Sequence, residues 1–182
     1  MKTNVIKHMS KQLVIIVEGP NKCGKSTLVD LIKDKSGFRF KTIKCSQPKD
    51  GDAFKEYSNI LDEIENNPDK NYIIDRFHFG SFVYGPIYRG KPDFSLEEFV
   101  KIEDRIINLN YIFVLAIASK SFIKNKFISE KEEFAKIELI DKEIELFKKT
   151  TIMSKLNIYN HNIPNKDLTK NDKILNIISL NL

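Results

Sequence analysis

The 182-residue chain contains little cysteine and little arginine, and it has no long apolar run. Its two cysteines, Cys23 and Cys45, are too few for a disulfide framework and lack the spacing of a metal site. No apolar stretch approaches the length of a transmembrane helix, and the first residues lack the apolar core and cleavage site of a signal peptide. We therefore expect a cytoplasmic protein with free thiols and no membrane segment.

A clustered basic surface is also missing. The formal net charge is +5 and the pI is near 9.0, but the lysines are spread along the sequence. A nucleic-acid-binding face normally concentrates Lys and Arg on one element. The positive charge therefore favours small anionic partners, such as nucleotide substrates, over nucleic acid. Arginine occurs only at positions 39, 76, 89 and 105, so an arginine within a loop is a candidate for a specific role.

The composition is typical of one globular domain. Hydrophobic residues make up 41% of the chain and charged residues 30%. A chain of 182 residues is long enough to bury a two-sided sheet, and no repeat, low-complexity tract or linker divides it. We expect a single domain over residues 1–182.

The most informative stretch runs from Gln12 to Ile32. Within it, residues 19–26 (Gly-Pro-Asn-Lys-Cys-Gly-Lys-Ser) match the phosphate-loop pattern G-x-x-x-x-G-K-[ST]. The apolar run from Leu13 to Val17 predicts a buried parallel strand before the loop, and the apolar spacing after it predicts a helix. Backbone N–H groups at such a helix N-terminus favour phosphate oxygens. The stretch therefore predicts binding of a nucleoside triphosphate.

Two residues of the loop have expected chemical roles. Lys25 should reach the β- and γ-phosphates of ATP, and the Ser26 hydroxyl should ligate Mg²⁺. The alternative is a glycine-rich turn with a surface lysine, which the strand–turn–helix setting disfavours. The residues expected to contact the nucleotide are Gly19, Asn21, Lys22, Cys23, Gly24, Lys25, Ser26 and Thr27.

The rest of the chain alternates between strand and helix patterns. The predicted strands are residues 40–45, 72–75, 111–118 and 156–159, and the predicted helices are residues 52–66, 95–109, 130–149 and 168–180. A capping box, Ser95-Leu96-Glu97-Glu98, marks one helix start. This order predicts an α/β, three-layer P-loop NTPase fold with a roughly five-stranded parallel sheet flanked by helices.

In a parallel sheet, ligands bind beyond the carboxyl ends of the strands. The segments expected around one cleft are therefore 19–26, 44–48, 75–89 and 119–129. The last of these, polar and weakly periodic, is the expected small lid at about 119–130.

Asp75 and Arg76 end one of the apolar strands. A carboxylate there can hold Mg²⁺ opposite Ser26, and the arginine fork suits a phosphate. A strand-end salt bridge at the surface would be the ordinary explanation for such a pair, but a phosphate loop upstream favours the catalytic one.

The phosphate loop preceded by Val17-Glu18, the triplet Asp75-Arg76-Phe77 and the following Ser81-Phe82-Val83-Tyr84 resemble the thymidylate kinase family, particularly its compact phage-type members. The resemblance implies a nucleoside monophosphate kinase fold and transfer of the ATP γ-phosphoryl group to a deoxynucleoside monophosphate, with dTMP as the leading acceptor. It also implies a mobile lid, a possible homodimer, and the host cytoplasm as the location if the protein is phage-encoded.

Carried over by position, the resemblance gives individual roles. Asn21 stands where many members have an acid that contacts the sugar 3′-hydroxyl, and Lys22 where some carry an arginine that neutralises the transferring group. The catalytic candidates are Lys25, Asp75, Arg76 and Lys22. The substrate-binding candidates are Lys44, Pro48, Phe54, Tyr57, Arg76, Ser81, Tyr84 and Arg89. Phe54 or Tyr57 could supply an aromatic face for the base, although residues at such helical spacing are more often core residues. The lid offers lysines at 120, 124 and 126 where the family has arginines.

Three alternatives remain open. A deoxynucleoside kinase of the same fold would need a general base near the end of the second strand, where Thr42 to Gln47 contains no carboxylate. A P-loop ATPase would need a residue that activates water. A 5′-polynucleotide kinase would need a basic track for the strand, and none is visible.

Overall fold

The computed structural model describes residues 12–47, 51–129, 136–163 and 173–181. The strands are β1 (Val14–Glu18), β2 (Phe40–Lys44), β3 (Asn71–Asp75), β4 (Tyr111–Ala118) and β5 (Ile158–Ile163). The helices are α1 (Lys25–Ser36), α2 (Ala53–Glu65), α3 (Phe79–Tyr84), α4 (Leu96–Ile107), α5 (Lys120–Ser129), α6 (Ile140–Met153) and α7 (Lys173–Leu180), with a π-helical turn η1 (Gly85–Arg89) and a 3₁₀ turn η2 (Ile137–Leu139). The expected α/β fold and five parallel strands are confirmed.

The five strands form one sheet in the order β2-β3-β1-β4-β5, and every neighbouring pair is parallel. β1 is the central strand, and all five of its side chains are buried. Its alternating residues pack on opposite faces, with Val14 and Ile16 in one core and Ile15 and Val17 in the other. The sheet is thus covered on both sides, as parallel sheets are.

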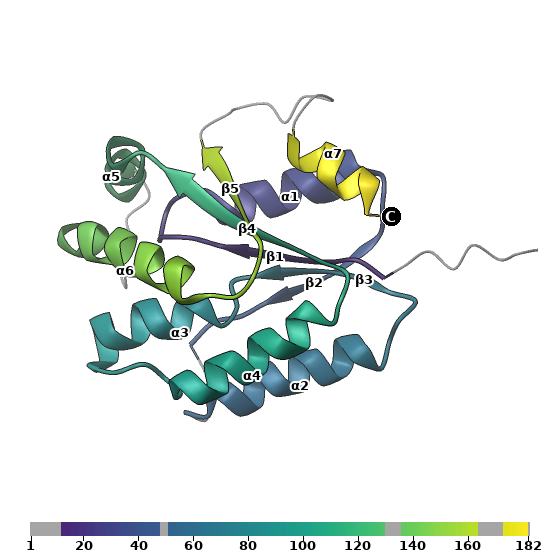
Figure 1. Cartoon of the computed structure of the whole chain (residues 1–182). Helices are drawn as coiled ribbons and strands as arrows, with labels where there is room; N and C mark the ends of the chain where they lie inside the picture. The colour runs from purple at the N-terminus through teal and green to yellow at the C-terminus, as the bar shows by residue number, and fades with distance from the viewer. Residues whose placement is uncertain (1–11, 48–50, 130–135, 164–172, 182) are drawn as a thin grey trace, which may run out of the picture.

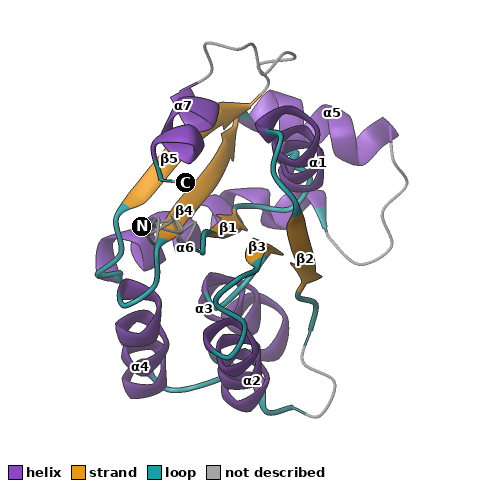
Figure 2. Cartoon of the chain, turned by 90° about the vertical axis from the view of Figure 1, so that its right-hand side faces the viewer, coloured by secondary structure: helices purple, strands orange, loops and turns teal. Residues whose placement is uncertain are grey.

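Two helical layers cover the sheet (Figures 1 and 2). Helices α2, α3 and α4 lie on one face, and α1, α5 and α7 supply apolar side chains to the core on the other. Helix α6 contacts both cores, contributing Phe147 to the first and Ile140 to the second. Phe99, Ile102 and Ile106 of α4 are buried in this packing, whereas Leu96 and Ile107 of the same helix are exposed. A dimer through α2 and α4 remains a prediction.

Local signals explain several helix starts. The predicted capping box is present: the Ser95 hydroxyl accepts the Glu98 N–H at 3.2 Å, and the Glu98 carboxylate accepts the Ser95 N–H at 2.8 Å. Asp52 caps α2 in the same way by accepting the Lys55 N–H at 2.9 Å. None of the helices in the described residues combines the length and the apolar character that a membrane crossing requires.

The boundaries in the C-terminal third differ from the predicted ones. The expected lid contains helix α5, which buries Ile123 and Phe127 one turn apart. The helix predicted over 130–149 begins at Ile140 within the described residues, and residues 130–135 lie outside them. The last strand runs over Ile158–Ile163 and not over 156–159, because pairing with β4 determines its extent.

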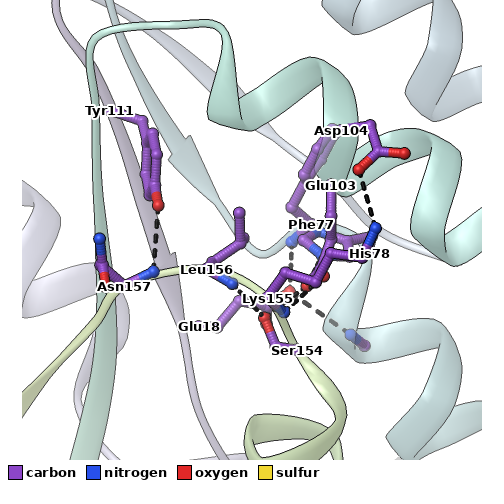
Figure 3. A network of polar contacts seen from close by, with 11 residues as sticks. Glu18, Phe77, His78, Glu103, Asp104, Tyr111, Ser154, Lys155, Leu156 and Asn157 are labelled. Carbon is purple, nitrogen blue, oxygen red and sulfur yellow. Dashed lines mark hydrogen bonds and ion pairs between the residues drawn. The ribbon is translucent and has the colours of Figure 1, made fainter.

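A buried carboxylate connects three segments beside the sheet (Figure 3). Glu103 of α4 is 1% exposed and accepts the Lys155 N–H at 2.8 Å and the Ser154 hydroxyl, and it lies 3.5 Å from Nε2 of buried His78. Burial alone would raise the pKa of Glu103, but the hydrogen bonds from His78, Lys155 and Ser154 outweigh it and lower that pKa. Burial lowers the pKa of His78. Glu103 therefore holds the segment after β3 against α4 and the end of α6.

These shifts predict that acid destabilises the fold in two stages. The folded state keeps His78 neutral, whereas the unfolded chain takes up a proton near its ordinary pKa of 6.5, so the free energy of unfolding should fall as the pH drops below 6.5. The lowered pKa of Glu103 adds a second loss below 4.5. Urea unfolding of the wild type and of His78→Gln between pH 8 and about pH 3 tests both stages. The variant should lose the first stage and keep the second, and equal slopes between pH 6.5 and about 5 would contradict the assignment.

Candidate functional site

The phosphate loop joins β1 to α1 through a backbone that requires glycine at position 19 and favours it at position 24. Gly19 has a φ of +146°, and a Cβ there would lie 2.4 Å from the Ala116 carbonyl oxygen. Gly24, with a φ of +94°, precedes α1 without a side-chain cap. Lys22 adopts a φ of +58°, which is uncommon for a residue other than glycine. The loop therefore holds a fixed curl, and the uncapped N-terminus of α1 can receive an anion.

The Lys25 side chain is buried against the loop backbone. It is 4% exposed, and its ammonium donates to the carbonyl oxygens of Gly19 at 2.8 Å and Pro20 at 2.6 Å. Burial lowers the pKa of Lys25, and the nearby Glu18 and Asp75 carboxylates act in the opposite direction. An anionic phosphate at this position would favour the charged form and give the ammonium a stronger acceptor.

Ser26 and Asp75 meet between neighbouring strands. Val17 of β1 is paired with Asp75 of β3, and the Ser26 hydroxyl donates to Oδ2 of Asp75 at 3.0 Å. The other oxygen, Oδ1, is buried and has no hydrogen-bond partner. A hydroxyl beside a carboxylate with a spare oxygen fits Mg²⁺, which in kinases takes one or two protein ligands together with phosphate oxygens and water. Groups of three or more His, Cys, Asp or Glu suited to a metal do not occur among the described residues.

Arg76 follows Asp75 at a φ of +68°. This left-handed conformation is stabilised on both sides: Arg76 N donates to the Val17 carbonyl at 2.9 Å, and Glu18 accepts the N–H groups of Phe77 at 2.7 Å and Gly80 at 3.4 Å. Burial raises the pKa of Glu18, while these N–H groups and Lys25 act to lower it. Glu18 thus directs the Arg76 side chain by fixing the turn that carries it.

A cleft of about 830 Å³ connects these groups. Its lining includes loop residues, the ends of β2 and β3, and the aromatic segment after β3: Asn21, Lys22, Gly24, Lys25, Ser26, Thr27, Cys45, Ser46, Gln47, Tyr57, Arg76, Phe77, Gly80, Ser81, Tyr84, Tyr88, Arg89, Asp93 and Lys126. Most of the nucleotide- and substrate-binding candidates therefore surround one space.

Other candidates lie elsewhere. Gly19, Cys23 and Asp75 are near the cleft but do not line it. Lys44 is exposed at the end of edge strand β2, and Phe54, in the first turn of α2, is half-buried against the core. Pro48 lies outside the described residues.

Hydrogen bonds connect the cleft residues that follow β3 to α2 and to the phosphate loop. The hydroxyls of Tyr57 and Ser81 are 3.2 Å apart, and the Tyr84 hydroxyl donates to the Gly19 carbonyl at 3.2 Å. Tyr84 therefore connects the segment after β3 to the phosphate loop. On the rim, Arg89 pairs with Asp93 through two bonds of 2.5 and 2.6 Å.

The lid lysines are placed differently from one another. Lys126 lines the cleft, whereas Lys120 pairs with Asp141 of α6 and Lys124 is exposed. Only Lys126 of the three is positioned to approach a ligand in this conformation.

Sequence reasoning predicted some of the cleft by segment but not by residue. Cys45, Ser46 and Gln47 lie in the expected segment 44–48 and Tyr88 in 75–89, but no role was predicted for them, and Asp93 lies outside the expected segments. Buried Glu143 of α6 bonds the loop residue Asn21. The sequence indicates that Glu143 is buried, because it lies three residues after Ile140 and four before Phe147, on the apolar face of its helix.

Comparisons with known proteins identify the fold. No protein-family model matches the chain, and no curated protein is similar to it in sequence. The solved YorR protein of Bacillus subtilis, in complex with phosphorylated GDP, is 24% identical with a TM-score of 0.70, covering 92% of this chain and 94% of its own. Polyphosphate kinase 2 of Arthrobacter aurescens TC1 is 16% identical with a TM-score of 0.56, covering 94% of this chain and 66% of its own. Deoxyadenosine kinase of M. mycoides with bound dATP is 14% identical with a TM-score of 0.59, covering 93% and 100%. These similarities show that the chain shares the α/β fold of these proteins.

The loop geometry predicts that Lys25→Ala weakens binding of a fluorescent ATP analogue about 10- to 100-fold, because a charge-assisted contact to phosphate is lost. Lys33→Ala, which removes an exposed lysine from the same helix, should bind as the wild type does. Fluorescence titration compares the two, and equal affinities would show that Lys25 does not contact the nucleotide.

Proposed function

We propose that the protein transfers the γ-phosphoryl group of ATP to a deoxynucleoside monophosphate, with dTMP as the leading acceptor. The observation that carries this proposal is the position of Arg76, which lines the same cleft as Lys25 and Ser26 but enters it from the neighbouring strand. A triphosphate on the loop and a monophosphate at Arg76 would then face each other. The deoxy sugar and the thymine base come from the family resemblance alone.

The charges around the cleft support an anionic acceptor. Five described lining residues are cationic: Lys22, Lys25, Arg76, Arg89 and Lys126. The carboxylate among the described lining residues is Asp93, which Arg89 engages through both oxygens. A phosphate acceptor is already ionised and benefits from this excess of positive charge.

In the proposed reaction, an oxygen of the acceptor phosphate forms a bond to the γ-phosphorus while the bond from that phosphorus to the β-phosphate oxygen breaks, giving the acceptor diphosphate and ADP. Lys25 would hold the donor phosphates and Arg76 the acceptor phosphate, while Lys22 and Lys126, which line the same cleft, would offset spreading negative charge. Mg²⁺ held by Ser26 and Asp75 would neutralise charge on the β- and γ-phosphates.

A deoxynucleoside kinase is the second candidate, since one structural neighbour is named as a deoxyadenosine kinase. A hydroxyl acceptor needs a general base within reach. The cleft residues at the end of β2 are Cys45, Ser46 and Gln47, none of which is a carboxylate. This composition favours the monophosphate. The proposed substrates are small metabolites, so we also propose a cytoplasmic location and no role for nucleic acid or a membrane.

An assay coupled to ADP production separates the candidates. With ATP, Mg²⁺ and a panel of nucleosides and monophosphates, we expect turnover that depends on a deoxynucleoside monophosphate and is highest with dTMP. Nucleosides should not support it. ADP release that is independent of any acceptor would instead identify an ATPase.

Arg76→Ala should lower kcat/KM for the monophosphate by about 10²- to 10³-fold, because a preorganised cation is removed from the acceptor phosphate. Affinity for the fluorescent ATP analogue should change little. Arg39→Ala, at an exposed position before β2, is the matched control and should retain full activity. An unchanged kcat/KM for Arg76→Ala would refute the acceptor-site assignment.

A further inference from the structure

Glu143 is a buried carboxylate that the proposed chemistry leaves without a role. It lies on α6 at 0% exposure. Its Oε2 accepts the backbone N–H of Asn21 at 2.9 Å, and its Oε1 accepts the Asn21 side-chain amide at 2.9 Å and the Tyr88 hydroxyl at 3.2 Å. Hydrogen bonds from these three donors offset the free-energy cost of burying the Glu143 carboxylate.

The two partners of Glu143 come from different segments of the cleft lining. Asn21 belongs to the phosphate loop, and Tyr88 belongs to η1, in the aromatic segment after β3. Burial and the neighbouring Glu143 carboxylate raise the pKa of Tyr88 to about 12, so its phenol remains a donor at neutral pH. One side chain from α6 therefore bridges the phosphate loop and the aromatic segment.

The contact also determines how the loop begins. The Asn21 N–H points to Glu143, so it is not among the loop N–H groups directed at a phosphate. The next residue, Lys22, takes the unusual φ of +58° and lines the cleft. The backbone nitrogen and the side-chain amide nitrogen of Asn21 each donate a hydrogen bond to Glu143, whereas the family resemblance would have this position contact the sugar.

We infer that Glu143 is a positioning residue that fixes Asn21 of the phosphate loop and Tyr88 of η1 at a set separation, and that Asn21 acts through this contact and not as a sugar ligand. The inference rests on the proposed phosphoryl transfer for its catalytic consequence, but the effect on the loop can be measured by nucleotide binding alone.

A carboxylate–amide swap tests it. In Asn21→Asp, two carboxylates face each other, and we expect a 10- to 100-fold loss of ATP-analogue affinity and of kcat/KM. In Glu143→Gln, the Asn21 amide can rotate to keep both contacts, and we expect a loss of no more than about threefold. In the double variant, the amide introduced at position 143 can accept the backbone N–H of residue 21 and donate to the new carboxylate there, so affinity and kcat/KM should return to within about fivefold of wild type.

Controls separate positioning from general stability. Glu145→Gln alters an exposed glutamate on the same helix and should leave affinity, kcat and KM unchanged. Thermal unfolding of each variant measures its stability. If Glu143 only stabilised the fold, the variants would have a lower Tm, and the double variant would not recover ATP-analogue affinity at temperatures where it is folded.

The double variant decides the outcome. A double variant no better than Asn21→Asp, or an Asn21→Asp that binds the ATP analogue as tightly as wild type, would overturn the inference. If no acceptor supports turnover, the proposed function is wrong. The ATP-analogue affinities of the two single variants and the double variant still decide the role of Glu143.

Discussion

The parallel pairing of β1 with β3 is the constraint on which the site depends. This register sets Val17 opposite Asp75, so the phosphate loop and the Asp75–Arg76 turn leave the sheet side by side. The bond from Ser26 to Asp75 crosses that junction at 3.0 Å. Because α1 and α3 then pass to opposite faces of the sheet (Figure 1), the cleft opens between them, at the switch point where α/β sheets bind ligands. A slip of one residue would turn Asp75 to the other face and separate the two halves of the site.

Three buried glutamates hold the segments around this junction. Glu18 fixes the turn that carries Arg76, Glu103 ties the segment after that turn to α4 and to the end of α6, and Glu143 connects α6 to the phosphate loop. Each accepts at least one backbone N–H from a segment far away in the sequence. Buried carboxylates contribute little net stability once their desolvation is counted, so their main effect here is to define geometry. The phosphate loop and the segment after β3 are therefore held by side chains that need not touch a substrate.

The fold was largely predictable because its signals are local. The phosphate-loop motif, the apolar runs of β1 and β4 and the capping box at Ser95 each indicate one element, and the order of elements then predicts the parallel sheet. Strand β5 was misplaced because its sequence, Ile-Tyr-Asn-His-Asn-Ile, has a polar centre and owes its extent to pairing with β4. The contact between Glu143 and Asn21 joins residues 122 positions apart, so no local pattern predicts it. Motifs thus predicted many of the residues that line the cleft, and the tertiary contacts that orient them required the structure.

We propose that donor and acceptor nucleotides occupy one continuous cleft. Calorimetric titration with a bisubstrate analogue, adenosine and thymidine joined through five phosphates, is the decisive measurement. We expect one analogue to bind per protein molecule, more tightly than ATP or dTMP alone, and to be displaced by either nucleotide. Displacement by ATP but not by dTMP or any other monophosphate would contradict it, because the acceptor would then lie outside the cleft that Lys25 and Arg76 share.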